Sequence, residues 1–374
     1  MARNDPRTQA RRSGAGAAVL PAVSRRVFGV LLDDTPIEAV TLRGAHGASA
    51  CVITFGASLQ SLILPDREGR LADVVLAYPN LHDYLAKPQY FGATVGRFAN
   101  RLSNGRFAIG DKSYQLPLND SPHSLHGGEH GFDWVAWRIV AVRSSPNPCV
   151  EMQYISAHGE QGYPGRLSVT ATYTLTNRNE LVIDYRATTD RITIVNLTNH
   201  TYWNLAGEGS GSVLGHRLRM PAERITVLDP TRVPTGEIRD VAGTPFDFRR
   251  GKPIGRDIDT PAEPLLLLGN GYDLNWVVSL NQPRRLRRVA QLEDPGSGRS
   301  FTMLSQQPGL QVYTGNFLDG SSRGKSGRAY HRHHAVSLEP QLHPDTPNQP
   351  DFGSALLSPG QTYRNLIIYR FAVA

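Results

Sequence analysis

Apolar and polar residues alternate in short runs along most of this chain. Residues 167–173 alternate with a period of two, as a half-buried β-strand requires. Residues 50–55 and 181–185 are short runs of mainly β-branched, aromatic and other apolar residues. The polar segment 176–180 predicts a hairpin connection between two of these runs. The pattern therefore predicts many short strands joined by turns.

Few segments sustain the 3.6-residue apolar period of a helix, and we expect one short helical turn at residues 79–84. The 36 glycines and 26 prolines are spread along the chain and punctuate the apolar runs. This texture predicts an all-β fold, either a sandwich or a barrel. Because the composition does not change after residue 26, residues 27–374 are expected to form a single large β domain.

The net charge of +7 is concentrated at the N-terminus. Residues 1–26 contain six arginines and one aspartate, a net charge of +5, which leaves only +2 for the rest of the chain. We expect this segment to be a disordered basic tail. A basic tail on a nearly neutral body is not the charge pattern of a protein that binds nucleic acid in a groove, so nucleic acid is not an expected partner.

The two cysteines, Cys51 and Cys149, are too few for a disulfide framework, and they form no Cys-x-x-Cys pair. Both lie in strand-like runs, so we expect them to be small buried apolar side chains. No apolar run approaches the ~20 residues needed to cross a membrane. The arginine-rich N-terminus also lacks the apolar core of a secretory signal. We therefore expect a cytoplasmic protein that has no membrane partner.

One histidine is surrounded by amides rather than by apolar residues. His200 has Asn196, Asn199 and Asn204 as near neighbours in the sequence. Amides can hold an imidazole in one tautomer and one orientation, which proton transfer requires. A buried, hydrogen-bonded structural histidine would give the same pattern. This motif therefore indicates a catalytic histidine only in combination with the other polar clusters of the chain.

Two clusters in the first half of the chain suit the binding of an oxygen-rich ligand. Asn100 and Arg101 lie in a Gly-, Asn- and Arg-rich segment that could be either a donor-presenting loop or a solvated turn. His126 precedes two glycines, which would let the backbone approach a ligand closely. Trp134 and Trp137 could offer flat faces to a sugar ring, although Trp137 is better interpreted as a core residue.

Three strand-borne polar residues follow in the last third of the chain. Asp273 lies between aromatic residues just before an apolar strand, and Gln311 faces the same way as Tyr313. Glu339 closes a strand-like run, where a buried carboxylate is costly without a partner. This glutamate is therefore either paired with a structural arginine or a working base.

Three further motifs are only weak indications of a metal, phosphate or hydrolase site. His331, His333 and His334 resemble metal ligands but have no acidic or cysteine partner at a ligand spacing, so we expect no metal site. Residues 324–327 lack the complete frame of a phosphate loop. Ser337 lacks the Gly-x-Ser-x-Gly elbow of serine hydrolases.

Taken in order, the polar clusters resemble those of the aldose 1-epimerase (galactose mutarotase) family. The resemblance begins near Phe28 and rests on residues 55–59, 96–107, 123–128, 196–207, 313–317 and 338–341. It implies a large antiparallel β-sandwich, a supersandwich, that binds a monosaccharide and interconverts its α and β anomers without a cofactor. The chain departs from the family pattern at Pro340, where threonine is expected, and at Trp203, where phenylalanine is common. Neither is a matched catalytic position.

The resemblance also implies roles for individual residues. Glu339 would take the proton of the C1 hydroxyl as the base, and His200 would protonate the ring oxygen as the acid, so that the ring opens. Ordinary pKa values of ~4.3 and ~6.5 predict an ionised Glu339 and a His200 whose pKa is raised by a nearby carboxylate. The sugar hydroxyls would be held by Asn100, Arg101, His126, Tyr202, Asp273 and Gln311.

The sequence is also compatible with other functions. The sugar could be a pentose or a hexose 6-phosphate, for which Arg323, Lys325 and Arg328 are the nearby basic candidates. A glycoside hydrolase would use Glu339 and Asp273 as a carboxylate pair and leave the histidine without a role. A non-catalytic sugar-binding module would not need the base and the acid together. We expect a monomer or a weak dimer.

Overall fold

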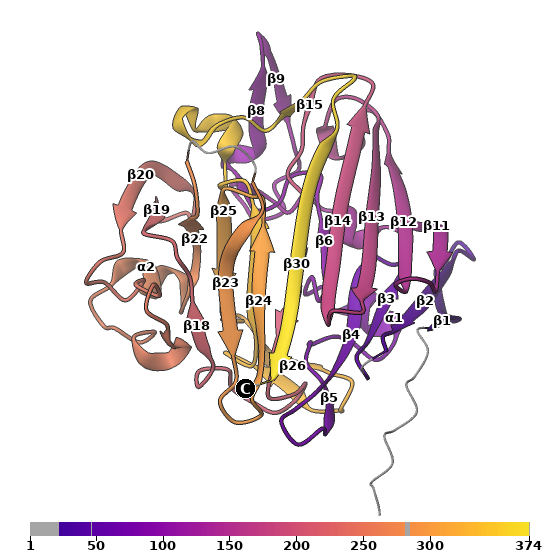
Figure 1. Ribbon diagram of the computed structural model, residues 1–374. Helices are drawn as coiled ribbons and strands as arrows, with labels where there is room; N and C mark the ends of the chain where they lie inside the picture. Colours follow the sequence, from indigo (N-terminus) through magenta and orange to yellow (C-terminus); the bar gives the residue numbers. More distant parts are fainter. Residues whose placement is uncertain (1–21, 46, 281–284, 374) are drawn as a thin grey trace, which may run out of the picture.

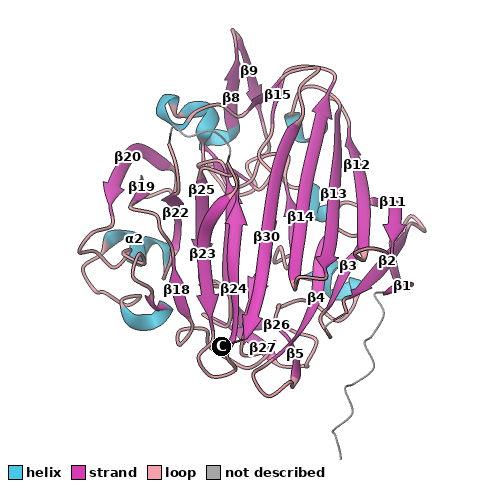
Figure 2. Cartoon of the chain, in the orientation of Figure 1, coloured by secondary structure: helices cyan, strands magenta, loops and turns pink. Residues whose placement is uncertain are grey.

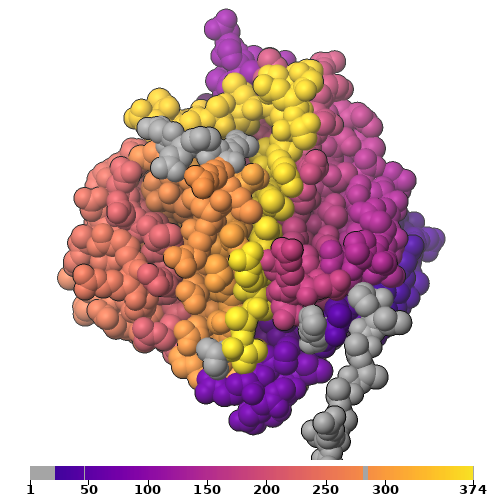
Figure 3. All heavy atoms as spheres, viewed as in Figure 1, coloured from indigo at the N-terminus to yellow at the C-terminus, as the bar shows by residue number. Residues whose placement is uncertain are grey.

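The computed structural model describes residues 22–45, 47–280 and 285–373, most of which belong to antiparallel strands and their connections (Figures 1 and 2). The largest sheet has nine strands, and the C-terminal strand β30 pairs with β14 on one side and β24 on the other. Figure 3 shows the outside of this sheet, with the yellow C-terminal segment between magenta and orange parts of the chain. The strand order is β11 (Arg138–Arg143), β12 (Cys149–Ser156), β13 (Leu167–Thr176), β14 (Glu180–Thr189), β30 (Tyr363–Val373), β24 (Arg299–Ser305), β23 (Arg287–Glu293), β18 (Arg217–Arg219) and β21 (Lys252–Pro253).

Two smaller sheets complete the sandwich. The five-stranded sheet has the order β1 (Ala22–Val30), β2 (Pro36–Arg43), β3 (Ser49–Ile53), β4 (Ser58–Pro65) and β5 (Leu71–Asp73). The six-stranded sheet has the order β17 (Tyr202–Trp203), β28 (Val336–Gln341), β25 (Gly309–Tyr313), β22 (Asp273–Val277), β19 (Arg224–Leu228) and β20 (Pro234–Asp240).

One hydrophobic core joins the three sheets. It contains Val40 of β2, Tyr173 of β13 and Leu338 of β28, all fully buried. Burial alternates along the whole of β13, as the sequence pattern predicts for a strand with one face on the core. The prediction of a large antiparallel β-sandwich is confirmed.

Short elements connect the sheets and cover their edges. The two α-helices of the described chain are α1 (Leu81–Ala86) and α2 (Pro264–Gly269). Neither has the length and apolar character needed to span a membrane. Two-stranded ladders join β7 (Arg101–Leu102) with β10 (Ser124–Leu125), β6 (Ala93–Val95) with β16 (Thr198–His200), β8 (Arg106–Ile109) with β9 (Lys112–Gln115), β15 (Thr193–Ile194) with β29 (Leu356–Leu357) and β26 (Asp319–Arg323) with β27 (Ala329–His331). Short 3₁₀ turns occupy Ser103–Gly105, Phe132–Trp134, Glu160–Gly162, Ile254–Arg256, Thr346–Asn348 and Pro350–Phe352.

The structure confirms several local predictions. The hairpin expected at residues 176–180 joins β13 to β14, and the expected helical turn is α1, which Asn80 caps by accepting the backbone N–H of Asp83. Cys51 and Cys149 are free and buried, as predicted.

The predicted boundary of the N-terminal tail is wrong. Residues 22–26 belong to β1, where Arg25 binds Glu38 of β2 with an Nη2–Oε2 distance of 2.7 Å. Strand pairing therefore outweighs the local arginine content that suggested a tail. Residues 1–21 lie outside the described residues.

Candidate active site

A cavity of about 220 Å³ opens on the face of the six-stranded sheet that points away from the core. Sixteen residues line it, and they include both predicted catalytic residues and every predicted binding residue. These residues lie far apart in the sequence, so the fold brings them together. They are Asn100, Arg101, His126, His200, Tyr202, Asp273, Gln311 and Glu339.

Strand alternation explains how the six-stranded sheet supplies its part of this wall. β28 is buried along its whole length because both of its faces are covered. Val336 and Leu338 belong to the core, so Glu339 lies on the opposite face. The ladder places Gln311 of β25 directly opposite Glu339, and the next ladder places Asp273 of β22 opposite Tyr313. The sequence pattern therefore determines that these polar groups share one face.

The segments around Arg101 and His126 add to the cavity wall over that face. Arg101 of β7 pairs with Leu125 of β10, just before His126. A Cβ atom at Gly127, where φ is +100°, would lie 2.0 Å from the carbonyl oxygen of Gly96. Glycine at this position therefore lets the two segments approach each other rather than a ligand, which corrects our expectation for the glycines after His126.

The predicted acid and base form a buried pair. His200 Nε2 lies 3.4 Å from Glu339 Oε1, and the two side chains are 5% and 2% exposed. Glu339 Oε2 is buried without a hydrogen-bond partner among the described residues. A buried acceptor without a partner is costly, and the hydroxyl of a bound ligand would satisfy it. Ser337 Oγ contacts the other ring nitrogen, His200 Nδ1, at 3.3 Å.

The ionisation of this pair differs from our expectation. Burial lowers the pKa of His200 to about 4. Burial and, secondarily, the charge of Asp273 raise the pKa of Glu339 well above its ordinary value. The predicted raised pKa of His200 is therefore wrong, and burial works against the predicted ionised form of Glu339, because the loss of water opposes both charges. One proton held by the pair then resides on the carboxyl group and leaves the imidazole neutral.

His126 is held in a single tautomer. The backbone N–H of Asn100 donates to His126 Nδ1 at 3.2 Å, so the proton of the neutral ring is on Nε2. Burial lowers the pKa of His126 well below its ordinary value, and the neighbouring His200 and Arg101 lower it further. His126 is therefore a neutral N–H donor.

This tautomer also bears on metal binding. One ligand atom from each of His126, His200 and Glu339 lies within 4.8 Å of the others. A histidine bound to a metal normally donates a hydrogen bond from its second nitrogen. In His126 the second nitrogen instead accepts the N–H of Asn100. This donor set therefore does not suit a metal ion.

Two charged residues that the sequence did not single out lie in the cavity wall. Asp120 Oδ2 accepts from Arg101 Nε at 2.6 Å, and Asp120 Oδ1 lies 3.8 Å from Arg232 Nη2. With Asp273, the wall contains two aspartates and two arginines, so these charges cancel. No local motif marks either residue, because each becomes part of the site only through long-range packing.

On the sheet side, Gln311 and Asp273 hold each other in place. Gln311 Nε2 donates to Asp273 Oδ1 at 2.7 Å. Since Asp273 and Gln311 lie on neighbouring strands, this bond fixes the orientation of both side chains toward the cavity.

Tyrosines rather than tryptophans form the aromatic wall. The ring centroids of Tyr90, Tyr202 and Tyr313 lie 5.8, 4.9 and 6.3 Å from that of His200. Trp134 packs against Phe55 outside the cavity. Trp137 is a core residue, as we favoured from the sequence. The tryptophan platform considered for a sugar ring is therefore wrong.

The alternative charged clusters lie outside the cavity. Lys325 Nζ pairs with Asp73 at 2.6 Å and donates to two backbone carbonyls. Arg323 and Arg328 also donate to backbone carbonyls. His333 Nδ1 donates to the carbonyl of Thr314. These contacts are structural, and none of these residues lines the cavity.

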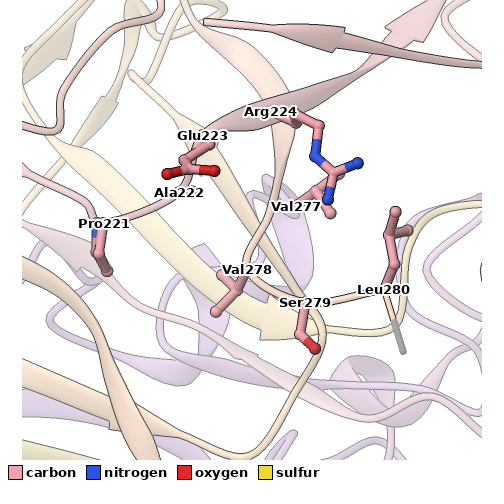
Figure 4. A pocket seen from close by; sticks show the side chains of 8 residues that line it. All are labelled: Pro221, Ala222, Glu223, Arg224, Val277, Val278, Ser279 and Leu280. Carbon is pink, nitrogen blue, oxygen red and sulfur yellow. The ribbon is translucent and has the colours of Figure 1, made fainter. Parts of the chain in front are cut away.

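A larger hollow of about 450 Å³ lies beside the ends of β19 and β22 (Figure 4). It is lined by residues 221–224 and 277–280. The side chains of Glu223 and Arg224 point away from each other in Figure 4, so no acid and base converge there. The 220 Å³ cavity is therefore the better candidate for the active site.

The structure is thus a large antiparallel β-sandwich with a buried glutamate–histidine pair in a polar pocket. The sequence matches the aldose 1-epimerase family over residues 38–370. The chain belongs to this family, and it is an isomerase.

Its relatives include galactose mutarotases and aldose 1-epimerases. The chain is 42% identical over 353 residues to galactose mutarotase of Mus musculus, with 94% of this chain and 99% of the relative covered. It is 41% identical over 323 residues to galactose mutarotase of Homo sapiens, with coverages of 86% and 91%. It is 32% identical over 342 residues to aldose 1-epimerase of Escherichia coli K12, with coverages of 91% and 96%.

Solved structures have the same fold. An aldose epimerase homologue from C. elegans is 34% identical, with a TM-score of 0.81 over 90% of this chain and 99% of that one. Galactose 1-epimerase from Lactobacillus acidophilus NCFM is 27% identical, with a TM-score of 0.83 and coverages of 95% and 99%.

Proposed function

We propose that this protein is an aldose 1-epimerase that interconverts the α and β anomers of a free hexose, glucose or galactose. The observation that carries the proposal is Glu339 Oε2, which has no hydrogen-bond partner among the described residues and is buried in a sugar-sized cavity beside His200. The cavity of about 220 Å³ is smaller than the ~300–1,000 Å³ typical of pockets for drug-sized ligands, which suits a single sugar ring.

In the proposed mechanism, Glu339 is the base and His200 is the acid. Glu339 removes the proton of the C1 hydroxyl, the C1–O1 bond becomes a carbonyl, and the bond from C1 to the ring oxygen breaks. His200 Nε2 delivers a proton to that ring oxygen. Rotation about C1–C2 and reversal of the proton transfers on the other face of the carbonyl produce the second anomer. No external nucleophile and no redox step are required.

The burial of the pair favours ring opening. Before the step the pair carries its proton on His200, and after the step the carboxyl group is protonated and the imidazole is neutral. Burial raises the pKa of Glu339 and lowers that of His200. Ring opening therefore returns the pair to the form that its environment stabilises.

The remaining polar side chains hold the sugar. His126 donates from Nε2, Arg101 donates from the part of its guanidinium that Asp120 does not occupy, and Asp273 accepts sugar hydroxyls. Asn100, Gln311 and Tyr202 complete the hydrogen-bonding set.

The charges of the cavity favour a neutral sugar over a sugar phosphate. Asp120 lies between Arg101 and Arg232, so neither arginine is a free cation for a phosphate group. The names of the relatives favour galactose among the neutral aldoses. A pentose remains the alternative substrate, and the ratio of rates with different sugars decides between them.

Polarimetry tests the proposal. Freshly dissolved α-D-galactose and α-D-glucose should approach the equilibrium rotation faster with the protein than without it. Glu339→Gln should slow the protein by about 10² to 10⁴-fold, the usual worth of one acid or base. The exposed Glu237 provides the matched control, because Glu237→Gln should leave the rate unchanged.

The outcomes separate the competing functions. A protein that binds galactose without accelerating its mutarotation is a sugar-binding module, and the proposal is then wrong. Acceleration with pentoses but with neither hexose would assign a pentose substrate. Loss of activity with retained affinity in Glu339→Gln would identify an enzyme whose base is Glu339.

We further propose a cytoplasmic monomer or weak dimer. The support for the location is the pair of free, buried cysteines, Cys51 and Cys149. Analytical ultracentrifugation over a range of protein concentrations would determine the oligomeric state, and cell fractionation would determine the location.

A further inference from the structure

His200 has a polar neighbour that the mechanism above does not use. Ser337 Oγ lies 3.3 Å from His200 Nδ1, and both side chains are buried. Ser337 stands two positions before Glu339 on β28, so both side chains lie on the cavity face of the strand. Tyr202 of β17 lies directly opposite Ser337 in the ladder, so the strand that follows His200 pairs with β28 at Ser337.

Proton transfer at one ring nitrogen constrains the other. Nε2 is the nitrogen that lies 3.4 Å from Glu339, so it must release and regain a proton in each cycle. Nδ1 must keep its proton throughout, because an imidazole without either proton is an anion that does not form near neutral pH. A buried Nδ1–H needs an acceptor, and the hydroxyl oxygen of Ser337 is placed to supply one.

We propose that Ser337 is a positioning residue whose hydroxyl oxygen accepts the Nδ1 proton of His200 and keeps Nε2 available for exchange with the ring oxygen of the sugar. The inference rests on the proposed function, because it assigns the tautomer that the proposed acid needs. The protonation of the pair agrees with it. A proton on the carboxyl group of Glu339 can be donated to Nε2 only if the imidazole proton is on Nδ1.

The neighbouring histidine shows the opposite arrangement. In His126, Nδ1 accepts the backbone N–H of Asn100, which places the ring proton on Nε2. In His200, Nδ1 faces a hydroxyl group that can accept. Two histidines whose ring centroids are 5.4 Å apart are thus held in opposite tautomers, one as a fixed donor and one as a proton carrier.

Kinetics of three variants test the role of the hydroxyl group. Ser337→Ala should lower kcat about ten- to a hundredfold, the worth of one hydrogen bond to a charged group, while KM changes less than about twofold. Ser337→Thr keeps the hydroxyl group and should recover most of kcat. Ser305→Ala removes another fully buried serine hydroxyl, on β24, and should leave both constants unchanged. A kcat for Ser337→Ala equal to that of Ser305→Ala would overturn the proposal.

A second measurement requires neither a variant of Ser337 nor activity. Nitrogen-15 NMR of the free protein distinguishes the two neutral tautomers, and the His200 signal is identified by its loss in His200→Gln. We expect the proton on Nδ1 in the wild-type protein. A proton on Nε2 would refute the role of Ser337 even if the protein is an active mutarotase. If the proton is on Nδ1 but the protein has no mutarotase activity, the proposed function is wrong and the tautomer assignment stands.

Discussion

At pH 5.5 the imidazole of His200 is expected to be neutral in the free protein. Its pKa of about 4 lies 1.5 units below this pH, so about 3% of the rings carry the second proton. A histidine with the ordinary pKa of ~6.5 would be about 91% protonated at the same pH. The two cases therefore differ about thirtyfold in the charged fraction.

The physical reason is burial without a compensating charge. His200 is packed among the rings of Tyr90, Tyr202 and Tyr313, which exclude water. Its nearest carboxyl group, on Glu339, has a raised pKa of its own, because burial disfavours the negative charge that would stabilise an imidazolium. The free energy of the imidazolium is therefore raised.

Nitrogen-15 NMR between pH 7 and pH 4 measures this charge directly. Glu339→Gln serves as the control, because a neutral amide in place of a neutral carboxyl group should leave the pKa of His200 low. A His200 that is mostly protonated at pH 5.5 in the wild-type protein would refute the reasoning. It would show that Glu339 is ionised and that the free site holds an ion pair.

The same titration should appear in the kinetics. Below a pH of about 4, a second proton enters the pair, so both groups are protonated and no base remains. The rate constant kcat/KM should therefore fall tenfold per pH unit on the acid side of about pH 4. On the alkaline side, activity should be lost when Glu339 releases its proton, because the pair then has no proton to deliver to the ring oxygen.

Three further predictions concern other parts of the molecule. Asp120→Asn should raise KM about ten- to a hundredfold in mutarotation kinetics with little change in kcat. The reason is that the buried Arg101 loses a charged partner worth about 1.5–3 kcal/mol. An unchanged KM would contradict this role of Asp120. Trp203→Ala should lower the free energy of unfolding by about 3–5 kcal/mol in urea titrations, since the fully buried ring of Trp203 packs on Phe301. A loss below about 1 kcal/mol would show that the core collapses to fill the space left by the ring. His216 is buried, with a folded-state pKa of about 4, so the folded protein binds fewer protons than the unfolded chain between pH 4 and ~6.5. The free energy of unfolding should therefore fall by up to about 3 kcal/mol as the pH drops through this range. His216→Gln should remove this part of the pH dependence.

Local patterns in the sequence were sufficient for the fold class and for the strand residues on the sheet side of the cavity. The period-two alternation around Glu339 and Gln311 already assigns each side chain to a face of its strand, because successive residues of a strand point to opposite sides. The structure confirms that the core residues lie on one face and the polar residues on the other. Residues in loops, such as Asn100 and His126, required the family resemblance, since loop geometry has no comparable period.

Other features could not be predicted from local patterns. Asp120 and Arg232 join the cavity through packing between segments that are distant in sequence. The sequence suggests Trp134 as a flat face for a sugar ring, whereas its ring packs on Phe55. The exposure of an aromatic side chain depends on what covers it, which local patterns do not determine. The boundary at Ala22 was missed because the pairing of β1 with β2 stabilises a segment that is locally rich in arginine.

The sequence by itself determined which face of each strand its polar residues occupy, because this follows from residue type and a period of two. The roles expected of these residues came from the family resemblance. Only the tertiary structure decided the protonation of those residues. The expected charges of Glu339 and His200 were those of groups in water, whereas the assembled cavity removes both from water and reverses the preference. The pKa of a side chain depends on its complete surroundings, and these exist only after segments from the whole chain have packed together.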